Sequence, residues 1–257
     1  EGDGVAFAEA FALQNDCRVR CHHKFGTAVL IFPDDFKIDV ASARMEYYLR
    51  PGALPDVEHA SVKMDLSRRD FTINTLAISL NQDAYGSLFD YYGGQRDIDD
   101  KVLRVLHNLS FVEDPTRVFR AVRFEQRLGF QIGKQTEHLL NSAVRLGLME
   151  KVSGHRVFSE LFLILNEPQP LPAVSRLARL DVLRQIHPKL TSKIDYSRSF
   201  DEARRTTDWY DLLYTGQPCE RWFCYFLVFT AILDRDEITN LSERLQLIPR
   251  YRDMLNQ

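Results

Sequence analysis

Residues 111–124 read FVEDPTRVFRAVRF, and this stretch decides how the surrounding chain folds. Asp114 followed by Pro115 is typical of a helix start, with the aspartate as N-cap and the proline as the first helical residue. Arginines then recur at three-residue spacing, at Arg117, Arg120 and Arg123. At about 100° per residue they share one arc, and the apolar residues fall mostly opposite. The sequence therefore predicts a helix with a buried apolar face and a cationic face.

A cationic face of arginines suits a phosphate-bearing ligand. Each guanidinium offers planar, bidentate N–H donors and stays charged. Residues 101–130 carry six basic and three acidic side chains, a local excess of +3, although the whole chain has a net charge of −3. A solvated helix face, with Asp114 acting only as a cap, would show the same pattern. This segment alone therefore leaves both interpretations open.

Two further segments add polar residues to the argument. Residues 67–77 read SRRDFTINTLA and predict an apolar helix that begins with Arg68, Arg69, Asp70 and Asn74. Residues 90–98 read DYYGGQRDI, where the two glycines predict a tight turn between strand-like runs. Alone, the first segment could be a capping cluster and the second an ordinary hairpin turn.

In this order and spacing, the three segments resemble the tRNA nucleotidyltransferase and poly(A) polymerase family, bacterial class II. Its members add CMP and AMP to the 3′ end of tRNA without a nucleic-acid template. The resemblance covers residues 1–165 by motif and residues 166–257 by helical character. It implies that Arg69 binds nucleotide, with Asp70 and Asn74 as supporting residues.

The resemblance also implies roles for the 111–124 segment. Its EDxxR pattern, formed by Glu113, Asp114 and Arg117, matches the protein template of the family. Arg120 and Arg123 match further nucleotide-binding arginines. The partners implied are the tRNA 3′ end, ATP and CTP.

The chemistry of the Asp114 and Arg117 pair is consistent with a template role. Cytosine and adenine each present an amino donor beside a ring-nitrogen acceptor, which a carboxylate and a guanidinium complement. Uracil and guanine present a carbonyl beside an N–H, so the carboxylate acceptor would face a carbonyl acceptor and the guanidinium donor would face an N–H donor. Unpaired polar groups in a closed site cost about 1–3 kcal/mol each, enough to select C and A. The choice between C and A stays open.

The resemblance implies Mg²⁺ as cofactor, held by two aspartates on a strand early in the head. The sequence opens at Glu1-Gly2-Asp3-Gly4, which looks like residues that directly follow that strand. We therefore expect a fragment that does not catalyse alone. Asp39 matches a third carboxylate of the wider superfold, and alternation over residues 36–41 places it away from the core. An ordinary solvent-facing strand residue would show the same alternation.

The expected architecture is α+β, with a partial nucleotidyltransferase head followed by helices. The predicted domains are a head at 1–108 with a small mixed sheet, a helical neck at 109–168 and a helical, RNA-binding body at 169–257. In the head we expect a helix at 5–14, strands at 17–20, 27–31, 36–41, 88–91 and 102–106, and a mobile loop at 48–62. Further helices are expected at 134–147, 155–166 and 172–179.

In the neck, Arg156 and Glu160 resemble residues that close around the nucleotide-binding helix. Their spacing first predicts an ion pair within one helix, with support of the site as the alternative.

Composition limits the classes of protein to which the chain can belong. The chain has 257 residues, 45% of them hydrophobic and 11% aromatic, which is enough for substantial cores. Four cysteines are too few for a disulfide framework and favour a reducing cytosol. The apolar run 222–233 is too short for a bilayer and predicts a buried helix, so a cytoplasmic protein without membrane contact is expected. A non-catalytic RNA- or nucleotide-binding module, a poly(A) polymerase and a helical interaction protein stay as alternatives.

Overall fold

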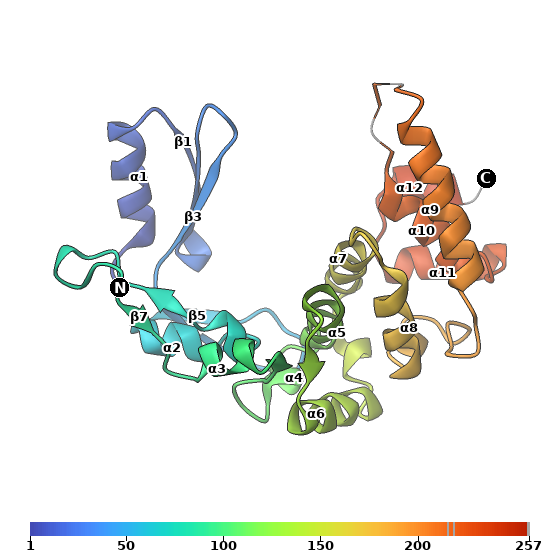
Figure 1. Cartoon of the computed structure of the whole chain (residues 1–257), viewed down its shortest axis with the longest axis horizontal. Helices are drawn as coiled ribbons and strands as arrows, with labels where there is room; N and C mark the ends of the chain where they lie inside the picture. Colours follow the sequence, from blue (N-terminus) through green and yellow to red (C-terminus); the bar gives the residue numbers. More distant parts are fainter. Residues whose placement is uncertain (215, 218, 256–257) are drawn as a thin grey trace. The chain divides into compact units, whose positions relative to one another are not determined.

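The computed structural model describes residues 1–214, 216–217 and 219–255, and the chain divides into two compact units (Figure 1). The first unit comprises Glu1–Leu49 and Leu54–Ile98, and the second comprises Arg50–Ala53 and Asp99–Gln257. Strands and helices mix in the first unit, whereas helices dominate the second. The predicted α+β class is therefore confirmed. The predicted neck and body both lie in the second unit, and their division at residue 168 stays a prediction.

The first unit opens with a helix packed on a three-stranded antiparallel sheet. These elements are α1 (Gly4–Gln14), β1 (Arg18–His22), β2 (Thr27–Ile31) and β3 (Lys37–Ala41), with the short 3-10 helix η1 (His23–Phe25) between β1 and β2. Asp3 caps α1, because its carboxylate accepts the N–H groups of Val5 and Ala6. Ala28 and Leu30 alternate inward along β2 and meet Ala8 of α1. The predicted helix and all three strands are confirmed.

The remainder of the first unit is built from short elements. They are β4 (Arg44–Tyr47), β5 (Asp56–His59), α2 (Val62–Ser67), η2 (Thr72–Asn74), β6 (Ala77–Ile78), η3 (Gln82–Ala84), β7 (Leu88–Phe89) and α3 (Gly94–Asp99). β4 pairs antiparallel with β5, and β6 pairs antiparallel with β7. The predicted loop at 48–62 is therefore wrong in its second half, which forms β5 and begins α2.

The polar segments of the first unit form turns where longer elements were predicted. No apolar helix follows Arg69, because the Asp70 carboxylate accepts the Phe71 N–H and the Asn74 amide, each at 2.9 Å, and fixes a turn there. Gly93 and Gly94 do not form a hairpin turn, since Gly94 begins α3. Both predictions are wrong for the same reason: a side-chain carboxylate satisfies backbone N–H groups locally.

Asp90 explains why a helix begins at the two glycines. Its carboxylate accepts the N–H of Gly94 at 2.8 Å and that of Gln95 at 3.0 Å. Desolvation raises the pKa of Asp90, but backbone hydrogen bonds from Gln95, Gly94, Gly93 and Tyr92 outweigh it and hold the pKa below its usual value. The carboxylate is therefore ionised when it caps the helix.

The second unit begins with a small parallel pair, β8 (Val102–Leu103) and β9 (Gln131–Ile132), and continues as helices. The helices and short 3-10 turns are α4 (Ser110–Glu113), α5 (Arg117–Leu128), α6 (Lys134–Arg145), η4 (Leu148–Lys151), α7 (Gly154–Leu165), α8 (Leu171–Arg179), η5 (Leu183–Gln185), α9 (Ser197–Asp211), α10 (Arg221–Thr230), α11 (Arg235–Arg244) and α12 (Pro249–Leu255). α5 packs against α7 and α8, and α10 packs against α7 and α9. The helices predicted near 134–147, 155–166 and 172–179 are confirmed.

Helix α10 is buried, as its apolar sequence predicted. Trp222 and Phe226 meet Phe158 of α7 edge to face, at ring-centroid distances of 5.7 and 6.2 Å. Tyr251 of α12 covers Trp222 from another side, at 4.8 Å. Within the described residues, no helix is long and apolar enough to cross a membrane.

Candidate functional site

Helix α5 is the centre of the candidate site in the second unit. It begins at Arg117, two residues later than the sequence predicted, because Pro115 and Thr116 form a tight turn ahead of it. Its apolar face is fully buried, as expected, and comprises Val118, Phe119, Ala121 and Val122. Thr116 therefore takes the N-cap position predicted for Asp114, and Asp114 fixes the turn ahead of the helix: its Oδ1 accepts the Thr116 N–H at 3.0 Å and the Thr116 hydroxyl at 2.6 Å.

Arg156 of α7 fixes Asp114 from the other side. Its Nη2 donates to Asp114 Oδ1 at 2.8 Å, and its Nη1 donates to the Gly52 carbonyl at 3.1 Å. Gly52 in turn donates its N–H to the Glu113 carbonyl at 3.3 Å. The predicted pair between Arg156 and Glu160 is therefore wrong, and the alternative of support for the site fits the contacts.

The Asp114 carboxylate keeps one oxygen available. All three of its side-chain bonds fall on Oδ1, and within the described residues none falls on Oδ2. The side chain is 17% exposed, so solvent or a ligand reaches it. The carboxylate is thus held in one orientation while one acceptor oxygen remains open.

Two of the arginines expected on the cationic face are buried. Arg117 is 4% exposed and donates from Nη1 to the Ser110 hydroxyl of α4 at 2.6 Å. Arg123 is 7% exposed and lies 3.6 Å from Glu167. The alternative of a solvated helix face is therefore wrong at these two positions, since α4 and the segment after α7 supply polar partners that helical periodicity cannot reveal.

Arg120 is more exposed than Arg117 and Arg123. Its side chain is 31% exposed, and its Nη1 lies 3.9 Å from Glu160 of α7. Both Arg120 and Arg123 place their guanidinium groups over the Phe124 ring, at 5.3 and 5.0 Å. Phe124 is thus a shared cation–π partner of the two guanidinium groups.

Arg123 also lines a cavity of about 340 Å³ together with Gln126, Arg127, Glu167 and Gln169. Its Nε is buried, and among the described residues nothing accepts a hydrogen bond from it. A buried donor without an acceptor is unfavourable.

The first unit carries Arg69, and its support comes from Asp65. Arg68 donates to Asp65 Oδ1 from Nη2 at 2.6 Å, and Arg69 donates to Oδ2 at 3.4 Å. Arg69 Nη1 also donates to the Asn74 carbonyl at 3.2 Å, and its side chain is 42% exposed. The sequence analysis missed Asp65. Its position in α2, three residues before Arg68 and four before Arg69, is the spacing at which helical side chains form ion pairs.

Comparisons with known proteins bear on this arrangement. Residues 1–104 match the poly A polymerase head domain, and residues 129–194 match the probable RNA and SrmB-binding site of polymerase A. A crystal structure of a tRNA nucleotidyltransferase with a primer tRNA and an incoming ATP analog is 34% identical, with a TM-score of 0.80, and the similarity covers 99% of this chain and 71% of that one. The chain belongs to the tRNA nucleotidyltransferase and poly(A) polymerase family.

Curated members of this nucleotidyltransferase family include closer sequences. The A-adding tRNA nucleotidyltransferase of Geobacter sulfurreducens is 52% identical over 99% of this chain, and that of Aquifex aeolicus is 39% identical over 95%. The chain spans 29% and 30% of the lengths of these two relatives. A CCA-adding enzyme in an apo form is 40% identical, with a TM-score of 0.84 over 99% of this chain and 60% of that one.

Asp39 is the carboxylate that the family resemblance assigns to metal. It is exposed on β3, opposite Val29 of β2. The alternation over residues 36–41 puts Phe36 and Ile38 on the face opposite Asp39, but they are 60% and 38% exposed, so that face is not part of the core at these positions. Among the residues described, no group of three or more His, Cys, Asp or Glu side chains is placed to hold a metal ion. These residues therefore do not complete a Mg²⁺ site, and Asp39 supplies one carboxylate at most.

Proposed function

We propose that this chain binds the incoming nucleotide and the tRNA 3′ end in an enzyme that transfers AMP, CMP or both from ATP and CTP to that end. The observation that carries the proposal is the Asp114 carboxylate, fixed by three bonds on Oδ1 with Oδ2 open. Such a group is an oriented hydrogen-bond acceptor, which is what recognition of an exocyclic amino group requires. AMP addition is the reaction we favour, because the two relatives named above are A-adding enzymes.

In this proposal Asp114 accepts from the amino group of adenine or cytosine, and Arg117 donates to the adjacent ring nitrogen. Arg120 and Arg123, stacked on Phe124, hold phosphate, and Arg69 of the first unit contributes a further nucleotide contact. Glu113, Arg156 and Glu160 position these groups, while Asp70 and Asn74 hold the turn beside Arg69. Mg²⁺ and the metal role of Asp39 are proposed from the family resemblance alone, and the base-reading roles do not depend on them.

Asp114→Asn tests the base-reading role by nucleotide binding. The 257-residue chain should bind ATP and CTP about 10-fold more tightly than UTP and GTP, because the latter leave polar groups unpaired. An asparagine amide both donates and accepts, so the variant should lose most of this preference. Isothermal titration calorimetry with the four triphosphates measures it.

The matched control for this prediction is Arg156→Gln. It removes the ion pair to Asp114 but keeps the carboxylate, so it should weaken binding without reversing the order of the nucleotides. Unchanged selectivity in Asp114→Asn would leave Asp114 only the role of fixing the turn ahead of α5. Equal loss of selectivity in both variants would make orientation, rather than the carboxylate itself, the source of selection.

Arg120→Ala tests the phosphate role. Because the Arg120 side chain is 31% exposed, its ion pair with Glu160 is partly screened by solvent, and its loss should cost little stability. We expect roughly 10-fold weaker ATP binding and little change for adenosine, which lacks phosphate. Arg145→Ala is the control, since Arg145 is an exposed arginine of α6 and does not line the cavity beside Arg123. A change in melting temperature without a change in ATP affinity would refute the phosphate role.

The reaction itself is tested by incorporation of labelled ATP and CTP. The encoded protein, including any sequence that precedes Glu1, is assayed beside the 257-residue chain on tRNA transcripts ending before CCA, after C and after CC. AMP incorporation restricted to the transcript ending in CC supports A addition. CMP incorporation would indicate CC or CCA addition, and no incorporation on any transcript would favour a non-catalytic RNA-binding protein.

A further inference from the structure

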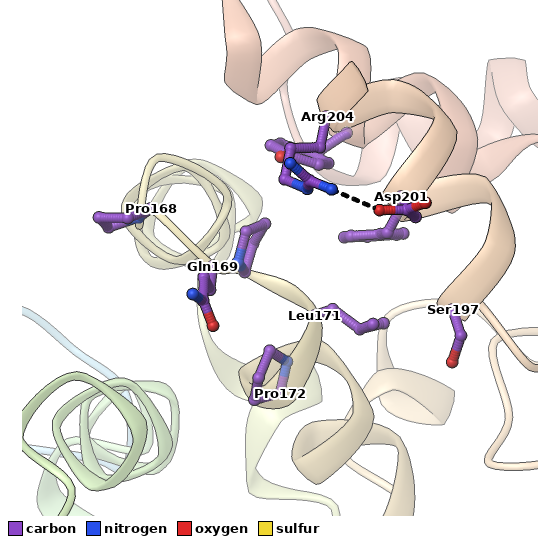
Figure 2. Close-up of a pocket in the computed structure, with 10 residues that line it drawn as sticks. Pro168, Gln169, Leu171, Pro172, Ser197, Asp201 and Arg204 are labelled. Atoms are coloured by element: carbon purple, nitrogen blue, oxygen red, sulfur yellow. Dashed lines mark hydrogen bonds and ion pairs between the residues drawn. The ribbon is translucent and has the colours of Figure 1, made fainter. Parts of the chain in front are cut away.

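A second cavity, of about 500 Å³, lies in the second unit and shares Pro168 and Gln169 with the cavity beside Arg123. One wall is formed by residues 168–172, which include three prolines and the start of α8. The other wall is one face of α9, with Ser197, Phe200, Asp201 and Arg204 at positions i, i+3, i+4 and i+7, and Tyr225 of α10 completes it. Figure 2 shows Leu171 and Pro172 across the cavity from Ser197 and Asp201.

The cavity walls suit a flat aromatic ligand. Proline rings and Leu171 offer rigid apolar surface, while Phe200 and Tyr225 lie stacked at a ring-centroid distance of 5.2 Å and an angle of 25°. Pockets of this size bury ligands up to that of a mononucleotide, and nucleobases pack well on aromatic and apolar side chains.

Tyr225 supplies a polar group to the cavity. The residue as a whole is only 4% exposed, and its side chain lines the cavity. Among the described residues, nothing forms a hydrogen bond with its hydroxyl, whose oxygen is not fully buried and is therefore open to a ligand. Burial raises the pKa of Tyr225, so the hydroxyl remains a neutral donor.

The polar edge of the cavity has the same residue types as the base-reading segment. Asp201 and Arg204 have the same three-residue spacing as Asp114 and Arg117, but both carboxylate oxygens of Asp201 have arginine partners, since Oδ2 lies 2.8 Å from Arg205. Arg204 Nη2 donates to Asp201 Oδ1 at 2.7 Å, an ion pair drawn in Figure 2. A carboxylate oxygen can accept more than one hydrogen bond, and a guanidinium has five N–H donors. Asp201 and Arg204 can therefore both bond a ligand while they stay bonded to each other.

We propose that this cavity binds a nucleobase that carries an amino group, adenine or cytosine, between the proline wall and the Phe200 and Tyr225 rings. The base comes either from a free nucleotide or from an unpaired nucleotide of RNA. Asp201 accepts from the amino group, Arg204 donates to the neighbouring ring nitrogen, and the Tyr225 hydroxyl supplies a further hydrogen bond. This site is separate from the one at Asp114.

Photo-crosslinking with 8-azido-AMP, followed by peptide mapping, tests the location on the 257-residue chain. The proposal expects labelled peptides from residues 197–225. Labelling at residues 110–124 alone would overturn the proposed cavity site and leave the base-reading site at Asp114 supported. Labelling at 197–225 alone would support the cavity site and count against base reading at Asp114. The experiment can therefore refute either site without refuting the other.

Two conservative variants test the contacts. Tyr225→Phe removes only a hydroxyl, and Asp201→Asn exchanges a carboxylate for an amide; each should weaken AMP and CMP binding roughly 5-fold in an Asp114→Ala background. Asp201→Asn should also lose the preference over UMP. Asp208→Asn is the control, because Asp208 bonds Arg204 from outside the cavity lining, and it should leave AMP affinity unchanged.

Competition identifies the source of the base. Displacement of labelled AMP by the single-stranded trinucleotide CCA supports an RNA base, whereas displacement by mononucleotides only supports a free nucleotide. AMP affinities that are the same in Tyr225→Phe, Asp201→Asn and Asp208→Asn would overturn the proposal. Melting temperatures of the three variants show whether each is folded, and either cavity variant alone decides the test if the other does not fold.

Discussion

Gly154→Val should unfold the second unit or lower its free energy of unfolding by roughly 3 kcal/mol or more. Gly154 begins α7 against the end of α11, and a Cβ atom built there collides with the Arg244 carbonyl oxygen. The Arg244 carbonyl carbon would be 2.7 Å away and the Leu245 Cα 3.0 Å away. All these atoms belong to the backbone, so no flexible side chain can yield. Urea denaturation followed by circular dichroism measures the loss.

Gly129→Ala is the matched control for Gly154→Val. Gly129 ends α5 with a φ of +65°, and nothing lies within 4 Å of a Cβ placed there. Its substitution should cost only about 1 kcal/mol, because the left-handed conformation is the sole penalty. A similar loss in both variants would show that α7 and α11 separate easily, contrary to the packing described.

The collision at Gly154 also bears on the candidate site. Gly154 precedes Arg156 by two residues, and Arg156 holds Asp114 through a 2.8 Å ion pair. A displaced start of α7 would move the guanidinium that orients the carboxylate. Gly154→Val should therefore impair nucleotide selection in any molecules that remain folded.

Local periodicity predicted helix α5 well, and tertiary contacts explain where prediction failed. Its apolar positions follow from 3.6-residue spacing, and all four are fully buried. The burial of Arg117 and Arg123 depends on Ser110 and Glu167, which belong to other segments of the chain. A single sequence without known contacts does not show which acid neutralises which arginine.

The interpretation of Arg156 failed for a related reason. Spacing of four residues made Glu160 its nearest acidic candidate, but a surface pair of that kind contributes only about 0.2–0.5 kcal/mol. The carboxylate of Asp114 and the carbonyl of Gly52 together offer a better site. By contrast, the turn at Asp70 was readable in principle, since Asp and Asn favour local side-chain bonds over helix continuation.

Asp65→Asn should lower the free energy of unfolding of the first unit by roughly 2 kcal/mol. Breaking a buried ion pair costs about 3–5 kcal/mol, and the partial exposure of Arg68 and Arg69 reduces that figure. Asp65 is 8% exposed and also accepts the Arg44 N–H at 3.2 Å, so the loss reaches β4 as well as the two arginines. Thermal denaturation of the variant and the unaltered chain gives the difference.

Asp83→Asn provides the comparison, because Asp83 is exposed in η3 and should change stability by less than about 0.5 kcal/mol. Equal stability losses in the two variants would show that Asp65 does not hold the arginines. Arg69 then separates structure from function. Its side chain is about twice as exposed as that of Arg68, at 42% against 20%. If Arg69 contacts nucleotide, Arg69→Gln should weaken ATP binding at little cost in stability, whereas Arg68→Gln should do the opposite, since Arg68 also pairs with Glu46 at 2.8 Å.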